Sequence, residues 1–270
     1  FQKKKAETVS AKKHNKVAYS EIVLQKLNEL GYTDAHGEMV NFAEYGVPQR
    51  RQRFLVIATR DNLSGDIFSK LEGNREKFLG AKGISAKISS QSALSDLERR
   101  HGTTKCPDSP RFLSGIVSAR QTEFQKTLRL IDKTNYVPDS HRFVNHTPAI
   151  QEVFELLLEK APRNRTIKGK ERELYGFKKR SLMVLDPEEP TPTITTIPDD
   201  FVHYSEPRVM TVRECARLQT FPDWFEFKGP YTTGNKERIK QVPRYTQVGN
   251  AVPPLFAEQL GVAITQVLSH

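Results

Sequence analysis

The stretch EYGVPQRRQRFLVIAT, residues 44–59, places three arginines directly before an apolar run. That run, FLVIA at residues 54–58, is short and rich in branched and aromatic side chains, which is typical of a strand buried on both faces. Side chains alternate along a strand, so an extended backbone puts Gln49, Arg51 and Arg53 on one face and turns Arg50 to the other. The pattern predicts a fork of hydrogen-bond donors at a buried strand, although solvated charges beside a strand would explain the same residues.

The flanking sequence predicts the elements around this strand. Residues 35–60 indicate two short strands joined through a turn, with Gly46 and Pro48 supplying the turn chemistry. Residues 19–31 predict a helix that ends at Gly31. Its apolar side chains recur at helical spacing: Ile22, Val23, Leu27 and Leu30.

The overall charge points to a polyanionic partner. The 270 residues carry a formal net charge of +10 and a pI near 9.5, and nucleic acid is the commonest such partner. Six lysines and one glutamate lie in residues 1–16, so +5 of this charge sits in an arm that we assign to residues 1–18. The arm is either a phosphate-contacting tail or a solvated, flexible terminus.

Cysteine usage and hydropathy narrow the class further. Cys106 and Cys215 lie far apart without clustered His or Cys neighbours, which argues against a disulfide framework and predicts no metal site. No apolar run suggests a membrane span, and the basic start lacks the apolar stretch of a signal peptide. We therefore expect a cytoplasmic protein without a membrane partner.

The middle of the chain, residues 64–205, has scattered Gly, Ser and Pro with short periodic segments, and predicts a separate lobe. One exception is the helix expected at residues 149–161, whose apolar stripe includes Phe154 and Leu157. The stretch EPTPTITTIPDD, residues 189–200, predicts extended structure. His141 and His146 are better explained by structural hydrogen bonds than by a metal.

The last third is more regular. Thr211 followed by Glu214 forms a capping-box pattern that predicts a short helix with Cys215 on its buried face. The stretch QVGNAVPPLFAEQL, residues 247–260, predicts a Gly249-Asn250 turn leading through two prolines into a helix. That loop is a plausible edge of a small-molecule site, and a plain helix entry is the alternative.

Three stretches, YGVPQRRQRFLVIA, TVRECARLQTFPDWFEF and QVGNAVPPLFAEQL, together resemble the eighth, ninth and tenth motifs of the DNA cytosine-5 methyltransferases, in that order. The resemblance covers residues 20–63 and 174–268, and residues 64–173 occupy the place of that family's target recognition domain. It implies an α/β fold: the C-terminal part of a Rossmann-like methyltransferase domain plus an irregular, mixed recognition lobe. Residues 19–63 would form the edge of the catalytic domain, 64–205 the lobe, and 206–270 the return to the catalytic domain.

The resemblance also implies site residues. Arg51 and Arg53, with Gln49 beside them, would lie in the cleft near a flipped cytosine and the DNA backbone. Asn250, Ala251 and Val252 would border the S-adenosyl-L-methionine pocket. Arg213 and Arg217 would support the docking of the recognition lobe. Candidate base readers lie in SARQTEFQKTLR, HRFVNH and RNRTIKGKERE, with solvated surface as the plainer alternative for each residue.

Three motifs of that family are missing from the sequence: the Pro-Cys nucleophile, the Glu-Asn-Val glutamate and the glycine-rich loop. The resemblance therefore predicts the C-terminal portion or subunit of a restriction-modification methyltransferase, inactive without an N-terminal half. That half would bring the nucleophile and most of the cofactor site. The alternatives are an inert sequence-specific DNA-binding module or remnant and, more weakly, a transfer RNA methyltransferase, which has a shorter stretch between the eighth and ninth motifs.

Overall fold

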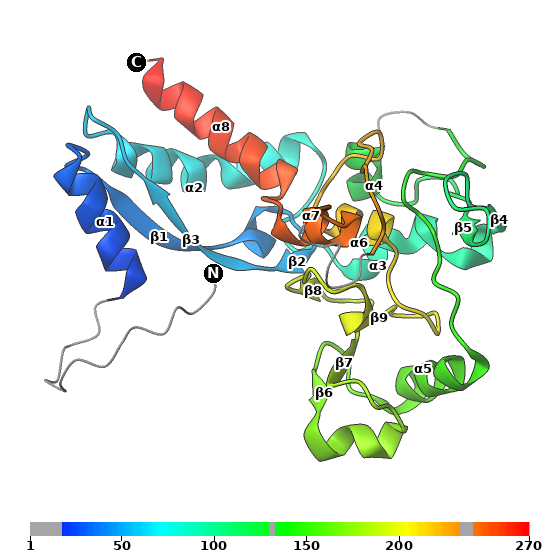
Figure 1. The fold of residues 1–270 in the computed structure, drawn as a ribbon. Coiled ribbons are helices and arrows are strands. Elements are labelled where there is room, and N and C mark those ends of the chain that lie inside the picture. Colours follow the sequence, from blue (N-terminus) through cyan, green and yellow to red (C-terminus); the bar gives the residue numbers. More distant parts are fainter. Residues whose placement is uncertain (1–17, 130–132, 233–239, 270) are drawn as a thin grey trace, which may run out of the picture.

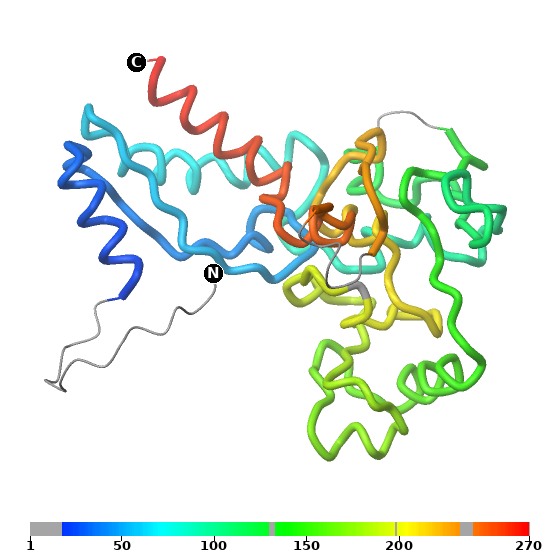
Figure 2. Tube along the Cα trace, in the orientation of Figure 1, coloured from blue at the N-terminus to red at the C-terminus, as the bar shows by residue number. Residues whose placement is uncertain are grey.

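A computed structural model describes residues 18–129, 133–232 and 240–269 (Figure 1). Most of the arm assigned to residues 1–18 lies outside these residues. The described chain has mixed α and β structure, as expected. Its first and last segments lie side by side at one end of the molecule, and the middle of the chain forms the other end (Figure 2).

An antiparallel hairpin lies at the centre of the end formed by the first and last segments of the chain. Strand β1, His36–Asn41, pairs with β3, Gln52–Ile57, in a register that runs from His36 opposite Ile57 to Asn41 opposite Gln52. The connection contains the 3-10 helix Phe42–Tyr45, which ends at Gly46 with a left-handed φ of 76°. A side chain at Gly46 would be strained at this φ. The two strands around a turn expected for residues 35–60 are thus confirmed.

Two long helices cover one face of this hairpin, α2 at Ser64–Ala81 and α8 at Pro254–Leu268 (Figure 1). They pack on each other and on the hairpin. Their joint core is a cluster of Val40, Phe42, Tyr45, Val47, Ile67, Leu71, Phe256 and Ala263. The separate lobe was predicted to begin at residue 64, but the apolar side of α2 packs on α8 and the hairpin.

The helix α1, Tyr19–Glu29, lies beside β1 and has no buried residue. The helix itself was expected, and among the described residues its apolar stripe faces no core. Leu24 and Leu27 are half-buried, and the rest of its apolar side is exposed.

The other end of the molecule contains the largest core. Helix α6, Val212–Leu218, lies at its centre with all seven residues buried, and it packs against α3, Ser90–Leu94, and α7, Arg244–Asn250. The capping box of Thr211 and Glu214 is present in full, as expected. The smaller elements of this region are 3-10 turns at Ser95–Leu97 and Arg99–His101, β4 at Thr103–Lys105, β5 at Leu113–Gly115 and α4 at Glu123–Leu128.

A smaller subdomain lies beside this core (Figure 1). Helix α5, Pro148–Lys160, packs its Phe154 and Leu157 against a three-stranded sheet in the order β6, β7, β9. The elements here are β6 at Ile167–Lys168, a 3-10 helix at Gly169–Tyr175, β7 at Ser181–Val184, a 3-10 turn at Pro198–Asp200 and β9 at Phe201–Val202. Between them, β8 at Thr191–Pro192 leaves the subdomain and pairs in parallel with β2, Gln49–Arg50.

One stretch, Arg244–Leu268, meets the length and composition of a membrane span, although no apolar run of that kind was expected. It consists of two helices, because α7 ends at Asn250 and α8 begins at Pro254. The 15 residues of α8 extend about 22 Å, which is shorter than the roughly 30 Å of a bilayer core. Its packing on α2 makes α8 a core helix.

Candidate functional site

The arginine-rich stretch lies where the chain changes partners. Residues Gln49 and Arg50 pair with β8, the residues from Gln52 onward pair with β1, and Arg51 stands between the two pairings. Gln49 is fully buried, and its Oε1 accepts a hydrogen bond from Ile194 N at 2.7 Å. Arg51 is 5% exposed and donates to Ile194 O at 3.3 Å and to Gly249 O at 3.0 Å. One arginine therefore ties the strand to both the lobe and the α7 end.

Arg53 does not share this environment. It is exposed, and its Nη1 donates to Gln52 O at 2.7 Å. Gln49 and Arg51 are buried whereas Arg53 is exposed, so the three residues do not share one environment, and their expected common face stays a prediction. The two guanidinium groups still act on each other through their charges.

The charge of Arg51 has no acidic counterpart among the described residues, and its side chain donates hydrogen bonds to two carbonyl oxygens. Burial, and secondarily the charge of Arg53, lowers the pKa of Arg51 to about 10. The neighbouring Arg50 behaves differently, because it is exposed and pairs with Glu189 at 2.5 Å. The site at Arg51 is thus electropositive and suited to an anion or a carbonyl oxygen.

Two buried donors at this site lack partners. Gln49 Nε2 and Arg51 Nε make no hydrogen bond although both are shielded from solvent. Buried donors in native proteins are almost always paired, and leaving one unpaired costs about 1–3 kcal/mol. Both unsatisfied donors belong to residues that hydrogen-bond Ile194.

The residues predicted to border the cofactor pocket, 250–252, follow Gly249 directly in the chain and therefore lie next to the Arg51 site. Gly249, whose carbonyl binds Arg51, approaches the lobe so closely that a Cβ would lie 2.6 Å from Thr195 O. The predicted Gly249-Asn250 turn is wrong, because both residues belong to α7 and the break comes at residues 251–253. Asn250 is exposed, Ala251 is half-buried and Val252 is 59% exposed.

Buried arginines join α6 to the lobe. Arg217 donates to Asp96 at 3.0 Å and to Asp223 at 2.6 Å, and Arg129 donates to the same Asp96 at 2.8 Å. Arg213 donates to the carbonyl of Asp139 at 2.8 Å. Arg213 and Arg217 are thus buried and bonded to residues 139 and 96, and their role in docking a recognition lobe stays a prediction. Asp96, which joins Arg217 and Arg129, was missed because nothing local in the sequence marks it.

Neither cysteine has the setting of a nucleophile. Cys215 is buried on α6, and burial raises the pKa of its thiol well above the usual value. Cys106 is 2% exposed and donates to Asp108 at 3.0 Å. His141 bonds Thr211 Oγ1 at 3.0 Å and Leu97 O at 2.8 Å, which confirms its structural role.

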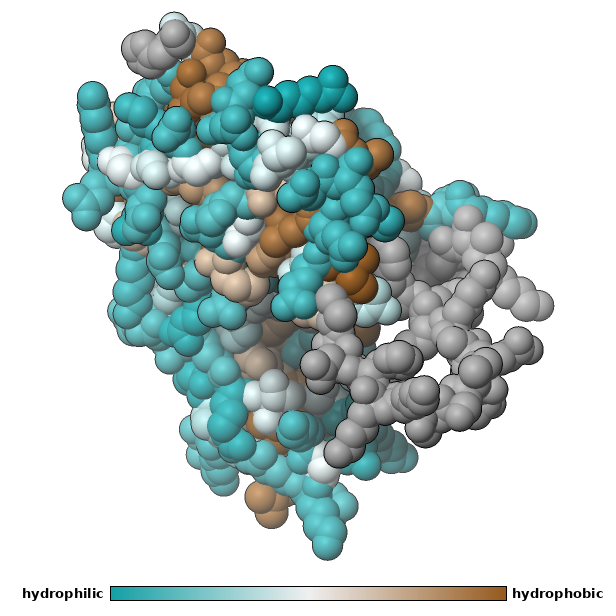
Figure 3. Space-filling view, turned by 90° about the vertical axis from the view of Figure 1, so that its left-hand side faces the viewer, coloured by the Kyte–Doolittle hydropathy of each residue, from teal (hydrophilic) through white to brown (hydrophobic). Residues whose placement is uncertain are grey.

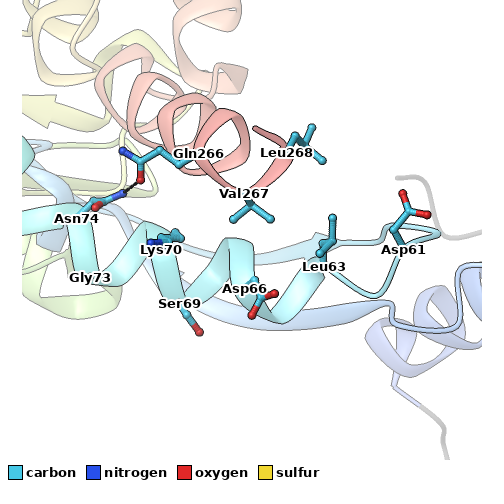
Figure 4. Close-up of a pocket in the computed structure, with 10 residues that line it drawn as sticks. All are labelled: Asp61, Leu63, Asp66, Ser69, Lys70, Gly73, Asn74, Gln266, Val267 and Leu268. Carbon is cyan, nitrogen blue, oxygen red and sulfur yellow. Dashed lines mark hydrogen bonds between the residues drawn. The ribbon is translucent and has the colours of Figure 1, made fainter. Parts of the chain in front are cut away.

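A separate groove runs between α2 and the C-terminal end of α8 (Figure 4). Asp66 and Lys70 line it from α2, Val267 and Leu268 from α8, and Asn74 donates to Gln266 at 2.8 Å across it. The groove opens at the far end of α8 from Asn250, and therefore lies away from the arginine site.

The chain belongs to the C-5 cytosine-specific DNA methylase family, whose model matches residues 8–266. It is similar to the type II methyltransferase M.DdeI of Desulfomicrobium norvegicum, with 29% identity over 275 residues, covering 95% of this chain and 60% of that protein. It is also similar to the type II methyltransferase M.AquIB of Picosynechococcus, with 47% identity over 87 residues, covering 31% of this chain and 62% of that protein.

The fold is similar to the crystal structure of a protein described as a DNA modification methyltransferase encoded within an E. coli prophage. The TM-score is 0.56 at 22% identity, with 93% of this chain and 66% of that chain covered. The chain thus spans a little under two thirds of the length of these proteins.

Proposed function

We propose that this chain is the target-recognition and cleft-completing portion of a DNA cytosine-5 methyltransferase from a restriction-modification system. It would act on duplex DNA with S-adenosyl-L-methionine as methyl donor. The observation that carries the proposal is Arg51, buried without an acidic partner among the described residues, with exposed Arg53 acting on it, in a chain whose family model covers residues 8–266.

The arginine pair serves the extruded base. Flipping a nucleotide out of the stack costs a few kcal/mol, and a guanidinium on a rigid strand offsets part of this cost by binding a base carbonyl or phosphate. Exposed Arg53 would contact the nucleotide. Buried Arg51, together with Gln49, would hold the strand at the required position and present the unpartnered donors.

Asn250, Ala251 and Val252 would border the S-adenosyl-L-methionine pocket. They follow directly on Gly249, whose carbonyl Arg51 holds, so the base site and the cofactor edge are joined through one side chain. Bound S-adenosyl-L-methionine supplies the methyl group. The residues of this chain would contribute one wall of its pocket.

The lobe offers a surface for DNA phosphates. Residues 163–180 contain eight Lys or Arg and two Glu, a net charge of +6. Several of these are exposed: Lys168, Lys170, Lys178 and Arg180. Such contacts supply affinity that falls steeply with salt.

The nucleophile, the general acid and the glycine-rich loop would come from a polypeptide segment that carries the Pro-Cys, Glu-Asn-Val and glycine-rich motifs. These motifs do not occur in the sequence. We call this polypeptide the motif-bearing segment.

The test is a transfer assay with the chain and the motif-bearing segment, using genomic DNA and tritiated S-adenosyl-L-methionine. We expect Arg53→Ala to lower methylation at least about 100-fold, while affinity for duplex DNA changes little. The matched control is Arg50→Ala, which removes an exposed arginine paired with Glu189 and should leave methylation near the wild-type level. A chain that only binds DNA would show no methylation with the segment, and that result would replace the proposal with the inert-module alternative.

A further inference from the structure

Thr220 has a backbone conformation that is unusual for its side chain. Its φ is 63°, in the left-handed region, where a β-branched residue is strained. The end of α6 requires this conformation: the amides of Phe221 and Thr220 donate to Ala216 O and Arg217 O, each at 2.9 Å, as in a Schellman motif. Glycine is the usual residue there, because it adopts a positive φ without strain. The helix end therefore explains the conformation, but not the choice of threonine.

The hydroxyl of this threonine has its partner in another element. Thr220 is 1% exposed, and its Oγ1 accepts a hydrogen bond from Leu255 N at 3.0 Å. Leu255 lies in the first turn of α8, where backbone amides have no acceptor within the helix. The N-cap of α8 is Pro253, which has no side-chain oxygen that could accept from these amides. Thr220 thus caps α8 from a position 35 residues earlier in the chain.

The residue before Thr220 holds the other side of the connection from α7 to α8. Gln219 is fully buried, and its Nε2 donates to Val248 O at 3.0 Å, near the end of α7. Two adjacent side chains at the end of α6 therefore bond the chain on both sides of residues 250–252.

The start of α8 is more deeply buried than its far end. Leu255 and Phe256 are buried in the two large cores. At the C-terminal end of α8, Figure 3 shows apolar side chains on the surface, and Leu268 is 62% exposed. The bond from Thr220 therefore acts at the buried end of the helix, where the connection enters it.

Between its two bonded ends, the connection itself reaches the surface. Asn250 and Val252 are both exposed and lie two residues apart. A side-chain amide beside an apolar side chain offers the mixture of polar and apolar contacts that lines small-molecule sites. Such contacts need support from behind, because a site loosens when the residues that hold it are free to shift.

We infer that Thr220 is a positioning residue for S-adenosyl-L-methionine: its hydroxyl caps α8 and thereby holds residues 250–252 against the cofactor. The inference rests on the proposed function and adds the residue that sets the geometry of the cofactor edge. Thr220 acts through the connection and does not touch the cofactor, since it is buried behind it. The hydrogen bond to Leu255 offsets the backbone strain that a threonine introduces.

The experiment is equilibrium dialysis of tritiated S-adenosyl-L-methionine, without DNA, against the complex of the chain with the motif-bearing segment. Thr220→Val keeps the side-chain shape and removes the hydroxyl, whereas the matched control Thr220→Ser keeps the hydroxyl and removes the methyl group. We expect Thr220→Val to raise the dissociation constant at least about fivefold and Thr220→Ser to leave it within about twofold. A residue that only fills space predicts the reverse order. That order, or equal affinities of the two variants, would overturn the inference.

Hydrogen exchange in the chain alone measures the cap of α8 directly. We expect the amide of Leu255 to exchange at least about tenfold faster in Thr220→Val than in Thr220→Ser, because only serine retains the acceptor. The amides of β3 serve as the internal reference and should exchange equally in both variants. Equal exchange at Leu255 would mean that the hydroxyl does not hold α8, and the inference would fall.

The two possible failures are distinguishable. If the wild-type complex binds no S-adenosyl-L-methionine, the proposed function fails and the inference fails with it. If the wild-type complex binds the cofactor and Thr220→Val binds it equally well, the inference alone fails. Circular dichroism establishes that the variants are folded. If Thr220→Val does not fold, Thr220→Gly takes its place, because glycine also lacks the hydroxyl and adopts the left-handed conformation without strain.

Discussion

Arg51 is a buried donor that links its own strand to two remote segments of the chain, and the sequence pattern predicted only the donor. The run of arginines predicted donors at the mouth of a strand, and the structure does place Gln49 and Arg51 together in a buried site. The carbonyls that Arg51 holds come from residues 194 and 249, which are remote in sequence. A local pattern specifies the donor, and only the tertiary structure specifies the acceptor.

We expect Arg51→Ala to lower the free energy of unfolding by about 1–3 kcal/mol, because the carbonyls of Ile194 and Gly249 lose their donor. The matched change Arg53→Ala should stay within about 0.5 kcal/mol, since Arg53 is exposed. Urea denaturation of both variants tests this contrast. Equal losses of unfolding free energy in the two variants would mean that the bonds from Arg51 to Ile194 and Gly249 do not stabilise the chain.

At the scale of secondary-structure elements, the connection from α7 to α8 depends on a close approach between the backbone at Gly249 and the backbone at residues 195–196. Gly249 lies against the backbone of Thr195 and Thr196, so the lobe and α7 touch through a position without a side chain. This contact places the predicted cofactor-edge residues beside the arginine site.

We expect Gly249→Ala to destabilise the chain by about 1–3 kcal/mol, because its Cβ would lie 2.6 Å from a backbone oxygen that cannot move freely. Gly261→Ala on α8 is the matched control. It has open space around its Cβ and should stabilise the helix by roughly 0.5–1 kcal/mol. Opposite shifts of the two melting temperatures would confirm the prediction, and a stabilising Gly249→Ala would contradict it.

Helices α1 and α2 show where local patterns mislead. In α2, glycines at 65, 73 and 80 and many charges obscured a helix of 18 residues whose Ile67 and Leu71 are buried. In α1 the periodicity predicted the helix correctly, but periodicity shows only that one face is apolar and not which element covers it. The capping box of α6 was predicted correctly because its partners lie three residues apart.

On the scale of the whole molecule, a buried polar network lies between the largest core, around α6, and the core of the smaller subdomain. Arg208 pairs with Glu214 through hydrogen bonds of 2.8 and 2.6 Å, and His203 and His141 lie against the same charges. Burial lowers the pKa of His141 to about 4 and that of His203 to about 3. The ordinary value of 6.5 applies to the unfolded chain.

We expect stability to fall on acidification below pH 6.5. Above that pH both histidines are neutral in either state, and below it the unfolded chain takes up protons that the folded chain excludes until about pH 4 or 3. The free energy of unfolding should therefore decrease with falling pH, by up to about 1.4 kcal/mol per pH unit for each histidine.

Urea midpoints between pH 6.5 and 5 measure this slope above the range where carboxylates of ordinary pKa titrate. The variant His203→Gln should show a slope smaller by about one proton. An unchanged slope in that variant would exclude His203 as a source of the pH dependence.

The sequence by itself determined the hairpin, the start of α6, the start of α8 and the family resemblance, because each depends on residues within a few positions of one another. The tertiary structure alone decided that α2 packs on α8 and the hairpin, that Arg51 is buried while Arg53 is exposed, and that Asp96 bonds two arginines. These features depend on contacts between segments up to 198 residues apart, such as Arg51 with Gly249. Local patterns cannot encode such pairings, because the free energy that selects them comes from burial and hydrogen bonding in the assembled molecule.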